Sequence, residues 1–274
     1  MTAEEKINKR KIDWILSPRT EFGFRAEDLS YVESTSYIIP NQIRDDIPTL
    51  NKFGYMKADI CGYGYDFIDY ASNIEDMVLE LGTAYGQVVL EALNRGANII
   101  ANDISTEHLE ILLENASDKY LDKLFLYPGK FSDEIDFSEN SLGAIYTARM
   151  IHFLSGDEVI KGLKKIHNWL KRDGKLYFIS VTPHHLAFRE RFLPIYNDRV
   201  IRGEEWPGRI ENHWEIAPQH EEFVPNFIQT FDIPQLEQLL PKFGLEIEKI
   251  SLFDYPNDIC SDGVGHVGLV ARKV

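Results

Sequence analysis

The stretch DMVLELGTAYGQVVLEALNRGANIIANDIS, residues 76–105, decides the fold predicted for this chain. Its first part, Met77–Leu81, is a short apolar run and predicts a buried strand. The glycines Gly82 and Gly86 then predict a turn, because glycine reaches backbone angles and close approaches that other residues avoid. Apolar residues recur at helical spacing over 85–95, so a helix follows the turn.

The same stretch continues into a second strand with an acid at its end. Gly96 ends the helix where glycine is favoured, residues 99–101 begin the strand, and Asp103 follows. A glycine turn before a helix leaves free N–H groups and a partial positive charge, which suits an anionic or polar ligand. An acid at the end of the second strand can accept hydrogen bonds from both ribose hydroxyls. Asp103 is therefore the candidate ribose ligand, with capping of the next helix as the alternative.

The glycine spacing distinguishes between adenosine-containing cofactors. A dinucleotide site needs Gly-x-Gly-x-x-Gly so that the backbone can contact a pyrophosphate. The register from Gly82 gives Gly82, Ala84 and Gln87, so two of the three glycines are missing. A nicotinamide cofactor is disfavoured for this reason. The methyl group of Ala84 is compatible with the turn only if that residue keeps a negative φ angle.

Residues 78–86 resemble the first motif of class I S-adenosylmethionine-dependent methyltransferases, of the type 11 kind, with Ala84 in place of the middle glycine. The run from Asp103 to Ser105 resembles their second motif, in which an apolar residue flanks the adenine. The resemblance implies S-adenosylmethionine as the cofactor. The residues that it implies for cofactor binding are Glu80, Gly82, Thr83, Ala84, Gly86, Gln87, Asp103, Ile104, Phe131 and Ala148.

Later segments carry the same resemblance. Residues 170–176, LKRDGKL, resemble the family's Leu-Lys-Pro-Gly-Gly-x-Leu signature between a helix and a strand. Lys130 stands where the family often has an acid for the adenine amino group, and an ammonium can only donate. The backbone N–H of Phe131 can still reach the adenine ring. The backbone around Ala148 is expected to meet the amino group of the cofactor.

The resemblance covers residues 76–182 and 229–274 and implies the fold class. That class is α/β: a Rossmann-like, doubly wound sheet of seven strands with an antiparallel last strand. We interpret residues 1–75, which are rich in tyrosine and broken by glycine and proline, as an N-terminal cap segment. Residues 76–274 are then the methyltransferase domain, in which the long loop 184–228 is interpreted as a lid over the substrate.

Composition and charge restrict the partners. Lys and Arg number 29 and Asp and Glu number 44, so the formal net charge is −15. Such a field repels phosphate backbones, and we expect no nucleic-acid partner. No apolar stretch is long enough to cross a bilayer, and the charged N-terminus lacks a signal-peptide core, so we expect a cytoplasmic protein without a membrane partner. Cys61 and Cys260 have no metal-like spacing and are expected to be reduced thiols.

The expected chemistry needs few reactive side chains. Methyl transfer is an in-line displacement at a carbon that the cofactor already activates, so the protein must mainly position the reactants and exclude water. We therefore expect no metal. His152 is the candidate general base, because its side chain titrates near neutrality, with a structural role as the alternative. His184 and His185 are weaker candidates for the same task.

The sequence leaves several alternatives open. A small molecule methylated on oxygen or nitrogen is the first hypothesis, with a protein side chain as a second kind of substrate. The departures at Ala84, Lys130 and Gly143 keep a non-catalytic interaction protein in view. Glu80 could cap backbone N–H groups rather than contact the cofactor. The methionine carboxylate could be held by an arginine of the N-terminal segment, and the sequence does not choose among Arg19, Arg25 and Arg44.

Overall fold

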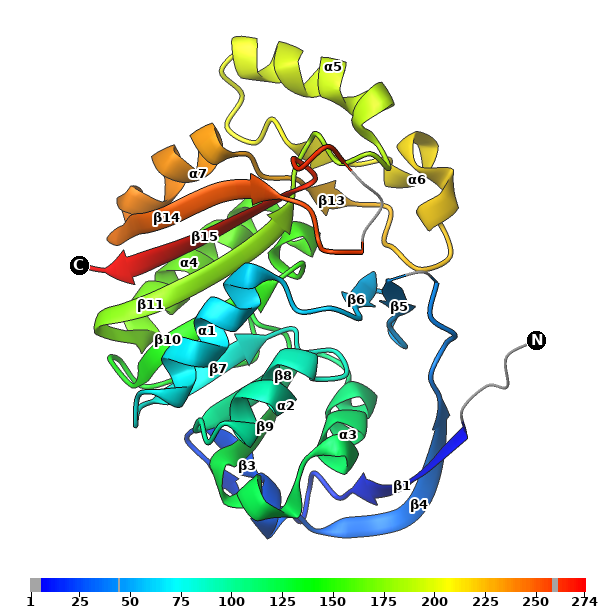
Figure 1. Ribbon diagram of the computed structural model, residues 1–274, viewed down its shortest axis with the longest axis vertical. Coiled ribbons are helices and arrows are strands. Elements are labelled where there is room, and N and C mark those ends of the chain that lie inside the picture. The colour runs from blue at the N-terminus through cyan, green and yellow to red at the C-terminus, as the bar shows by residue number, and fades with distance from the viewer. Residues whose placement is uncertain (1–5, 44, 258–260) are drawn as a thin grey trace.

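A computed structural model describes residues 6–43, 45–257 and 261–274 (Figure 1). Within these residues, nine strands form one mixed sheet that carries helices on both faces. This arrangement confirms the doubly wound α/β fold. The spatial order of the strands is β14 (Leu245–Phe253), β15 (His266–Lys273), β11 (Leu170–Val181), β10 (Leu142–Ala148), β7 (Met77–Leu81), β8 (Ile99–Asp103), β9 (Leu124–Pro128), β3 (Gly23–Arg25) and β2 (Arg19–Thr20).

The sheet has two strands more than the seven expected. Strands β9, β8, β7, β10 and β11 are parallel, and β15 runs antiparallel to both of its neighbours, as expected for the last strand. The additional strands come from the N-terminal segment, where Phe24 and Arg25 pair antiparallel with β9 and β2 pairs with β3. Strands of two and three residues are too short to show an alternating pattern in the sequence.

Two hydrophobic layers cover the sheet. Val78 and Ile99 belong to one layer and Leu79 and Ile100 to the other, because successive side chains of a strand point to opposite faces. Each fully buried side chain of this kind stabilises the fold by about 1.5–3 kcal/mol. The helices of the first layer are α1 (Gly62–Ser72), α2 (Gln87–Asn94) and α3 (Thr106–Asn115), and those of the second are α4 (Gly156–Trp169) and α7 (Ile233–Leu239). Short 3-10 helices lie at η1 (Ala26–Asp28), η2 (Asp118–Lys123), η3 (Ile151–Phe153) and η5 (Leu240–Phe243).

The turn between β7 and α2 requires its glycines. Gly82 has a φ angle of 73° and Gly86 one of 81°, both in the left-handed region. A β-carbon on Gly82 would lie 2.6 Å from Cγ of Met150, and one on Gly86 would overlap Leu112 of α3. The two glycines therefore let the turn pass close to its neighbours. A similar constraint explains Gly143, where a β-carbon would lie 2.6 Å from that of Asp76.

The N-terminal segment is divided between several places in the fold. A two-stranded ribbon of β1 (Lys6–Ile12) and β4 (Tyr31–Ile38) lies along α3 (Figure 1). Glu110 of α3 holds it, accepting hydrogen bonds from the Ile12 N–H at 3.1 Å and the Tyr37 hydroxyl at 2.5 Å. A second pair, β5 (Asp46–Pro48) and β6 (Tyr55–Lys57), precedes α1. Since β2, β3 and α1 belong to the main sheet and its first layer, the division at residue 75 stays a prediction.

The insertion after β11 was expected to be a long loop, but it contains helices and short strands. It holds α5 (Arg189–Ile201), β12 (Arg209–Ile210), α6 (His213–Ile216), η4 (Pro218–His220) and β13 (Ile228–Gln229). The insertion has a small hydrophobic core of its own, which includes Phe188, Phe192 and Tyr196. Tyr55 packs against this core. Figure 1 shows α5 and α6 beyond the carboxyl end of β11. The insertion therefore lies on the side of the sheet where the strands β7, β8 and β10 also end.

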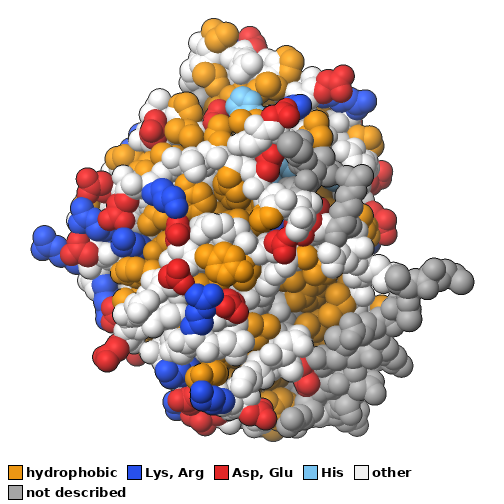
Figure 2. Space-filling view, viewed as in Figure 1, with side chains coloured by type: hydrophobic (Ala, Val, Ile, Leu, Met, Phe, Trp, Pro, Cys, Tyr) orange, Lys and Arg blue, Asp and Glu red, His pale blue; other side chains and the backbone are white. Residues whose placement is uncertain are grey.

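Charged side chains are spread over the surface. Figure 2 shows acidic and basic groups interspersed on one face, with apolar side chains between them. The negative charge visible there is distributed rather than gathered in one patch. Among the described residues, no helix has both the length and the apolar character needed to span a membrane.

Candidate active site

A cavity of about 300 Å³ opens at the carboxyl ends of β7, β8 and β10, the edge where open α/β sheets bind ligands. Nine of the ten residues expected to bind the cofactor line it: Glu80, Gly82, Thr83, Ala84, Gln87, Asp103, Ile104, Phe131 and Ala148. The tenth, Gly86, is not part of the wall and instead packs against Leu112. The fold thus brings both sequence motifs to one cavity.

Ala84 does not meet the condition that its methyl group sets for the turn. Its φ angle is 46°, in the left-handed region, rather than negative. Such a conformation costs about 1–2 kcal/mol for a residue with a β-carbon. The conformation directs the Ala84 N–H to Oδ2 of Asp103 at 2.9 Å, and this charge-assisted hydrogen bond offsets part of the cost. The bond also ties the first motif directly to the second.

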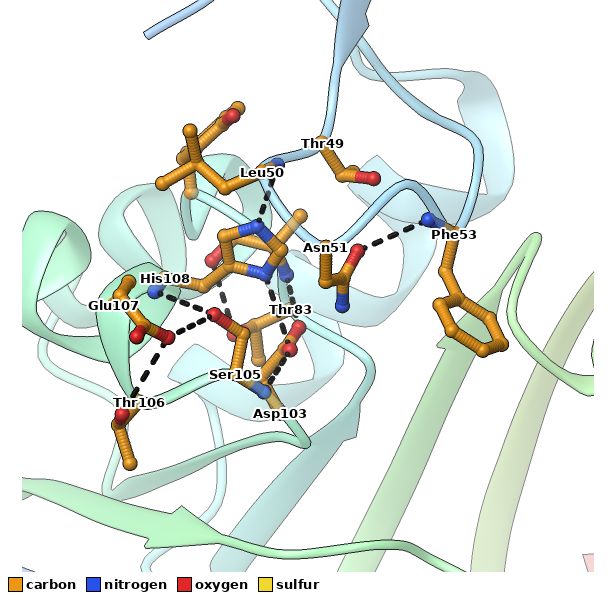
Figure 3. A network of polar contacts seen from close by, with 12 residues as sticks. Thr49, Leu50, Asn51, Phe53, Thr83, Asp103, Ser105, Thr106, Glu107 and His108 are labelled. Atoms are coloured by element: carbon orange, nitrogen blue, oxygen red, sulfur yellow. Dashed lines mark hydrogen bonds and ion pairs between the residues drawn. The ribbon is translucent and has the colours of Figure 1, made fainter. Parts of the chain in front are cut away.

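Asp103 is held on several sides (Figure 3). Its Oδ1 accepts the Ser105 N–H at 2.9 Å and lies 3.1 Å from Nδ1 of His108, while Oδ2 accepts from Ala84. Ser105, rather than Asp103, caps α3, because its hydroxyl accepts the His108 N–H. A carboxylate has about four acceptor sites, so the three internal bonds leave Asp103 able to accept from a ligand hydroxyl. The alternative role as a helix cap is therefore filled by its neighbour.

His108 connects Asp103 to the N-terminal segment. Its Nε2 accepts the Leu50 N–H at 3.1 Å, so the ring proton lies on Nδ1, where it is donated to Asp103 (Figure 3). The ring is also packed edge-on against Tyr85, whose hydroxyl donates to the carbonyl of Pro48 at 2.8 Å. His108 of α3 and Tyr85 of the turn therefore hold residues 48–50 in place. The neighbouring Thr49 and Asn51 line the cavity.

Glu80 is a buried acid whose two oxygens differ. A hydrogen bond from the backbone of Val89 in α2 reaches its carboxylate, whereas Oε2 is buried and has no partner among the described residues. Burial raises the pKa of Glu80 well above its usual value, and the nearby Asp103 adds to this. The expectation of backbone capping and the expectation of ligand contact are thus compatible, since one oxygen remains for the ligand.

The residues expected near the adenine belong to the cavity wall. Ile104 is half exposed, and Phe131 is buried with its ring against Gly162 of α4. Lys130 lines the wall, and its Nζ pairs with Glu158 at 2.5 Å and Asp133 at 3.0 Å. The ammonium group of Lys130 is therefore already paired with two carboxylates.

The family model described as a methyltransferase domain matches residues 78–174, the part of the chain that holds β7, the glycine turn, β8 and β10. Residues 78–174 therefore carry a methyltransferase domain. Phosphoethanolamine N-methyltransferase 1 of Triticum aestivum is 27% identical over 114 residues, which are 42% of this chain. The matched part is 23% of that protein, so this chain spans under a quarter of the curated relative's length.

Solved structures share the fold of the methyltransferase domain. A S-adenosylmethionine-dependent methyltransferase of Methanosarcina mazei is 18% identical with a TM-score of 0.57, over 79% of this chain and 99% of that one. The Burkholderia thailandensis 1,6-didemethyltoxoflavin-N1-methyltransferase, solved with its substrate and S-adenosylhomocysteine, is 15% identical with a TM-score of 0.55, over 78% and 79%. At these identities the likeness shows the fold alone.

S-adenosylmethionine is named as the cofactor of the Methanosarcina mazei protein, and two fold neighbours were solved with S-adenosylhomocysteine or sinefungin. The cavity fits S-adenosylmethionine on its own observations: the unpartnered Oε2 of Glu80 is a buried acceptor for the polar methionine part, and Asp103 retains acceptor capacity for the ribose. When bound, the cofactor supplies a methyl group activated by a sulfonium sulfur. The half-exposed Ile104 and the buried Phe131 offer apolar surface for the adenine.

His152 does not reach the cavity of the methyltransferase domain. Its side chain is buried, it is not among the lining residues, and its Nδ1 has no partner among the described residues. Burial, with Arg149 nearby, lowers the pKa of His152 well below its usual value. The expected role as general base is not supported by this position. His184 pairs with Asp232 at 3.2 Å, and neither it nor His185 lines the cavity.

The other N-terminal and cysteine expectations have mixed outcomes. Arg19 stacks over Tyr127 at 4.6 Å and Arg25 pairs with Glu27 at 2.8 Å, and neither lines the cavity. Arg44 and Cys260 lie outside the described residues. Cys61 is a buried free thiol on the cavity wall. Within the described part of the chain, no group of three or more acidic, histidine or cysteine side chains forms a possible metal site.

The structure adds cavity residues that the sequence analysis did not single out. His108 is one of them, and in the sequence it looks like an ordinary member of an amphipathic helix. The others are aromatic and basic residues of the cavity wall: Phe53, Tyr55, Lys57, Arg149, Phe153 and Tyr255. Only Arg149 had a usable signal, since it directly follows β10 at the edge where ligands bind. The rest come together from three distant parts of the chain.

Proposed function

We propose that this protein transfers the methyl group of S-adenosylmethionine to an oxygen or nitrogen atom of a small molecule. The observation that carries the proposal is the continuity of the cavity. Its walls run from Asp103 and Glu80 at the cofactor motifs to the aromatic side chains of Tyr55, Phe153 and Tyr255. An enclosed aromatic end beside a cofactor site suits a small acceptor, because ligand pockets are concave and largely apolar.

The insertion 184–228 forms the outer part of this end in our proposal. Phe223 accepts the Gly54 N–H with its carbonyl at 2.7 Å, and its ring lies 5.7 Å from that of Tyr55. Tyr55 also lies against His220, with ring centroids 6.4 Å apart. The insertion thus packs on the N-terminal strands that line the cavity. We infer that it acts as a lid that keeps water from the reacting atoms.

The chain's own part in the reaction is binding and orientation. Glu80 and Asp103 are the proposed contacts to the methionine part and the ribose of the cofactor. The aromatic end holds the acceptor so that its nucleophilic atom lies in line with the carbon–sulfur bond that breaks. A small acceptor is supported by the relatives, since one acts on phosphoethanolamine and a fold neighbour was solved with 1,6-didemethyltoxoflavin.

Transfer of radiolabel tests the proposal. The protein is incubated with S-adenosylmethionine labelled in its methyl group and with a cell extract separated by size into a small-molecule and a protein fraction. We expect label in the small-molecule fraction. Label in the protein fraction alone would point to side-chain methylation. Absence of transfer by a protein that still binds S-adenosylmethionine would support the non-catalytic alternative.

A further inference from the structure

Arg149 is a largely buried cation on the wall of the cavity. It follows the last residue of β10, and its φ angle of 55° lies in the left-handed region that side chains rarely adopt. Its N–H donates to the carbonyl of Ile179 at 2.9 Å, which holds this conformation. The side chain is 15% exposed and lines the cavity, and its Nε has no partner among the described residues. Strained backbone held by neighbouring structure is typical of functional positions.

The charge of Arg149 is only partly balanced. Its guanidinium lies 3.4 Å from Oδ1 of Asp46, and the same oxygen lies 3.0 Å from Nζ of Lys57, a lysine that is 4% exposed. Burial alone would raise the pKa of Asp46, but Arg149 and Lys57 outweigh it and hold the pKa below its usual value. Arg149 therefore shares the ionised carboxylate of Asp46 with Lys57. A largely buried charge such as that of Arg149, whose pairing is incomplete, favours a further partner.

The histidines close to Arg149 supply no negative charge. Burial lowers the pKa of His152 and His266 well below the usual value and that of His220 to about 4, and Arg149 contributes to each. These rings are therefore neutral at physiological pH. Asp59 also lines the cavity, but its carboxylate accepts a hydrogen bond from Asn257. It is not paired with either cation in the described structure.

The walls around the two cations are aromatic. The rings of Phe53 and Phe153 lie edge to face, 5.6 Å apart, and both line the cavity with Tyr55. Nζ of Lys57 lies 5.6 Å from the ring centre of Tyr255. Few water molecules fit beside such surfaces, so a charge–charge contact is weakened less than in bulk water. An anion that reaches Arg149 here would be bound strongly and in a defined orientation.

We propose that the acceptor carries a negatively charged group, a carboxylate or a phosphate, which binds the guanidinium of Arg149 with Lys57 beside it. The planar fork of arginine matches both kinds of anion. The inference rests on the proposed function, since it assigns the substrate class of that same cavity. The overall charge of −15 repels anions at long range, so affinity for one has to come from a local site of this kind.

Calorimetry on the full chain saturated with S-adenosylhomocysteine tests this inference. The probes are acetate, inorganic phosphate and benzoate, with benzamide as the neutral match of benzoate. We expect benzoate to bind at least about tenfold more tightly than benzamide, as one charge-assisted contact provides. The relative affinities of acetate and phosphate distinguish the two anion classes.

Variants locate the binding. Arg149→Met should remove the preference for benzoate, and Arg149→Lys should retain part of it. Arg95→Met is the matched control, because it removes the same charge from an exposed arginine that pairs with Glu91 and Asp69. Affinity for S-adenosylhomocysteine is measured for every variant.

Three outcomes overturn the inference. The first is that no anion binds, the second that benzamide binds as well as benzoate. The third is that Arg149→Met weakens S-adenosylhomocysteine about tenfold or more, in which case the guanidinium serves the carboxylate of the cofactor itself. All three leave open the methyl transfer measured by radiolabel, so the two proposals fail separately.

Discussion

The burial of the Glu80 carboxyl group costs stability, and this cost is the one most directly related to ligand binding. It lies inside an apolar strand, one of its oxygens lacks a partner in the described structure, and burial raises its pKa well above 4.5. A protein without a ligand keeps this acid at the expense of stability, because the charged form is poorly solvated. The acid therefore makes sense as part of a binding site rather than of the core.

The Glu80→Gln substitution tests this point through pH. The folded form holds the carboxyl proton more tightly than the unfolded chain, so the free energy of unfolding falls as pH rises from about 4.5 through the raised pKa. Glutamine keeps the shape without the proton, and the decline between pH 5 and pH 8 should shrink. Urea unfolding measures it. Glu237→Gln, on the exposed face of α7, is the control, and an equal decline in all three proteins contradicts the account.

Ala84→Gly gives the second test at this scale. The φ angle of 46° costs alanine about 1–2 kcal/mol, and glycine removes that cost. Glycine also raises the conformational entropy of the unfolded chain, which lowers stability by about 0.4–1 kcal/mol. We expect a net gain in stability of up to about 1 kcal/mol. Ala92→Gly, inside α2, is the control and should destabilise by about 1 kcal/mol or more. The account is contradicted if both substitutions destabilise alike in urea.

The turn that joins β7 to α2 shows how far local sequence carries at the scale of elements. Strand, glycine turn, helix and second strand were all predicted, because each depends on residues close together in the chain. The side chain of His152 was placed wrongly, since a position after a strand does not say which way a side chain points. Lys57 escaped notice because its position depends on pairing with Asp46 and packing against Tyr255.

Gly86→Ala tests the close packing of this turn against α3. A β-carbon would overlap Leu112, and the φ angle of 81° adds strain. Gly203→Ala is the matched control, with a φ angle of 70° and nothing within 4 Å of the added carbon. We expect about 1–2 kcal/mol of destabilisation for the control and an additional 1–3 kcal/mol or so for Gly86→Ala. Equal losses in thermal unfolding would mean that the contact with α3 yields freely.

The whole molecule combines a doubly wound sheet with additions at the edge where its parallel strands end. The seven central strands follow from patterns in the sequence, whereas β2 and β3 are too short to predict and the insertion folds on a core of its own. The aromatic end of the cavity is built from the N-terminal strands, the segment after β10 and the loop at Tyr255. Contacts between such distant parts leave no periodic signal, so this aromatic part of the cavity could not be predicted, whereas the part lined by the two sequence motifs was.

Removal of the insertion is the test at this scale. The chain enters and leaves it at neighbouring points, since the Phe231 N–H donates to the carbonyl of Val181 at 3.1 Å. Replacing residues 184–228 by a short glycine–serine linker should leave S-adenosylmethionine affinity within about threefold and abolish methyl transfer. The control inserts the same linker after the exposed Gly203 and should retain transfer. Transfer at the normal rate by the shortened, folded protein would show that the insertion is not a lid.

The most direct measurement is calorimetric titration of the protein with S-adenosylmethionine, S-adenosylhomocysteine and NAD in parallel, repeated on Asp103→Ala. We predict that both sulfur compounds bind one to one in the micromolar range and that NAD does not bind. Asp103→Ala should weaken both by about 1.5–3 kcal/mol, the value of a charge-assisted hydrogen bond. Binding of NAD, no binding of any of the three, or unchanged affinity in Asp103→Ala would contradict the cofactor site described here.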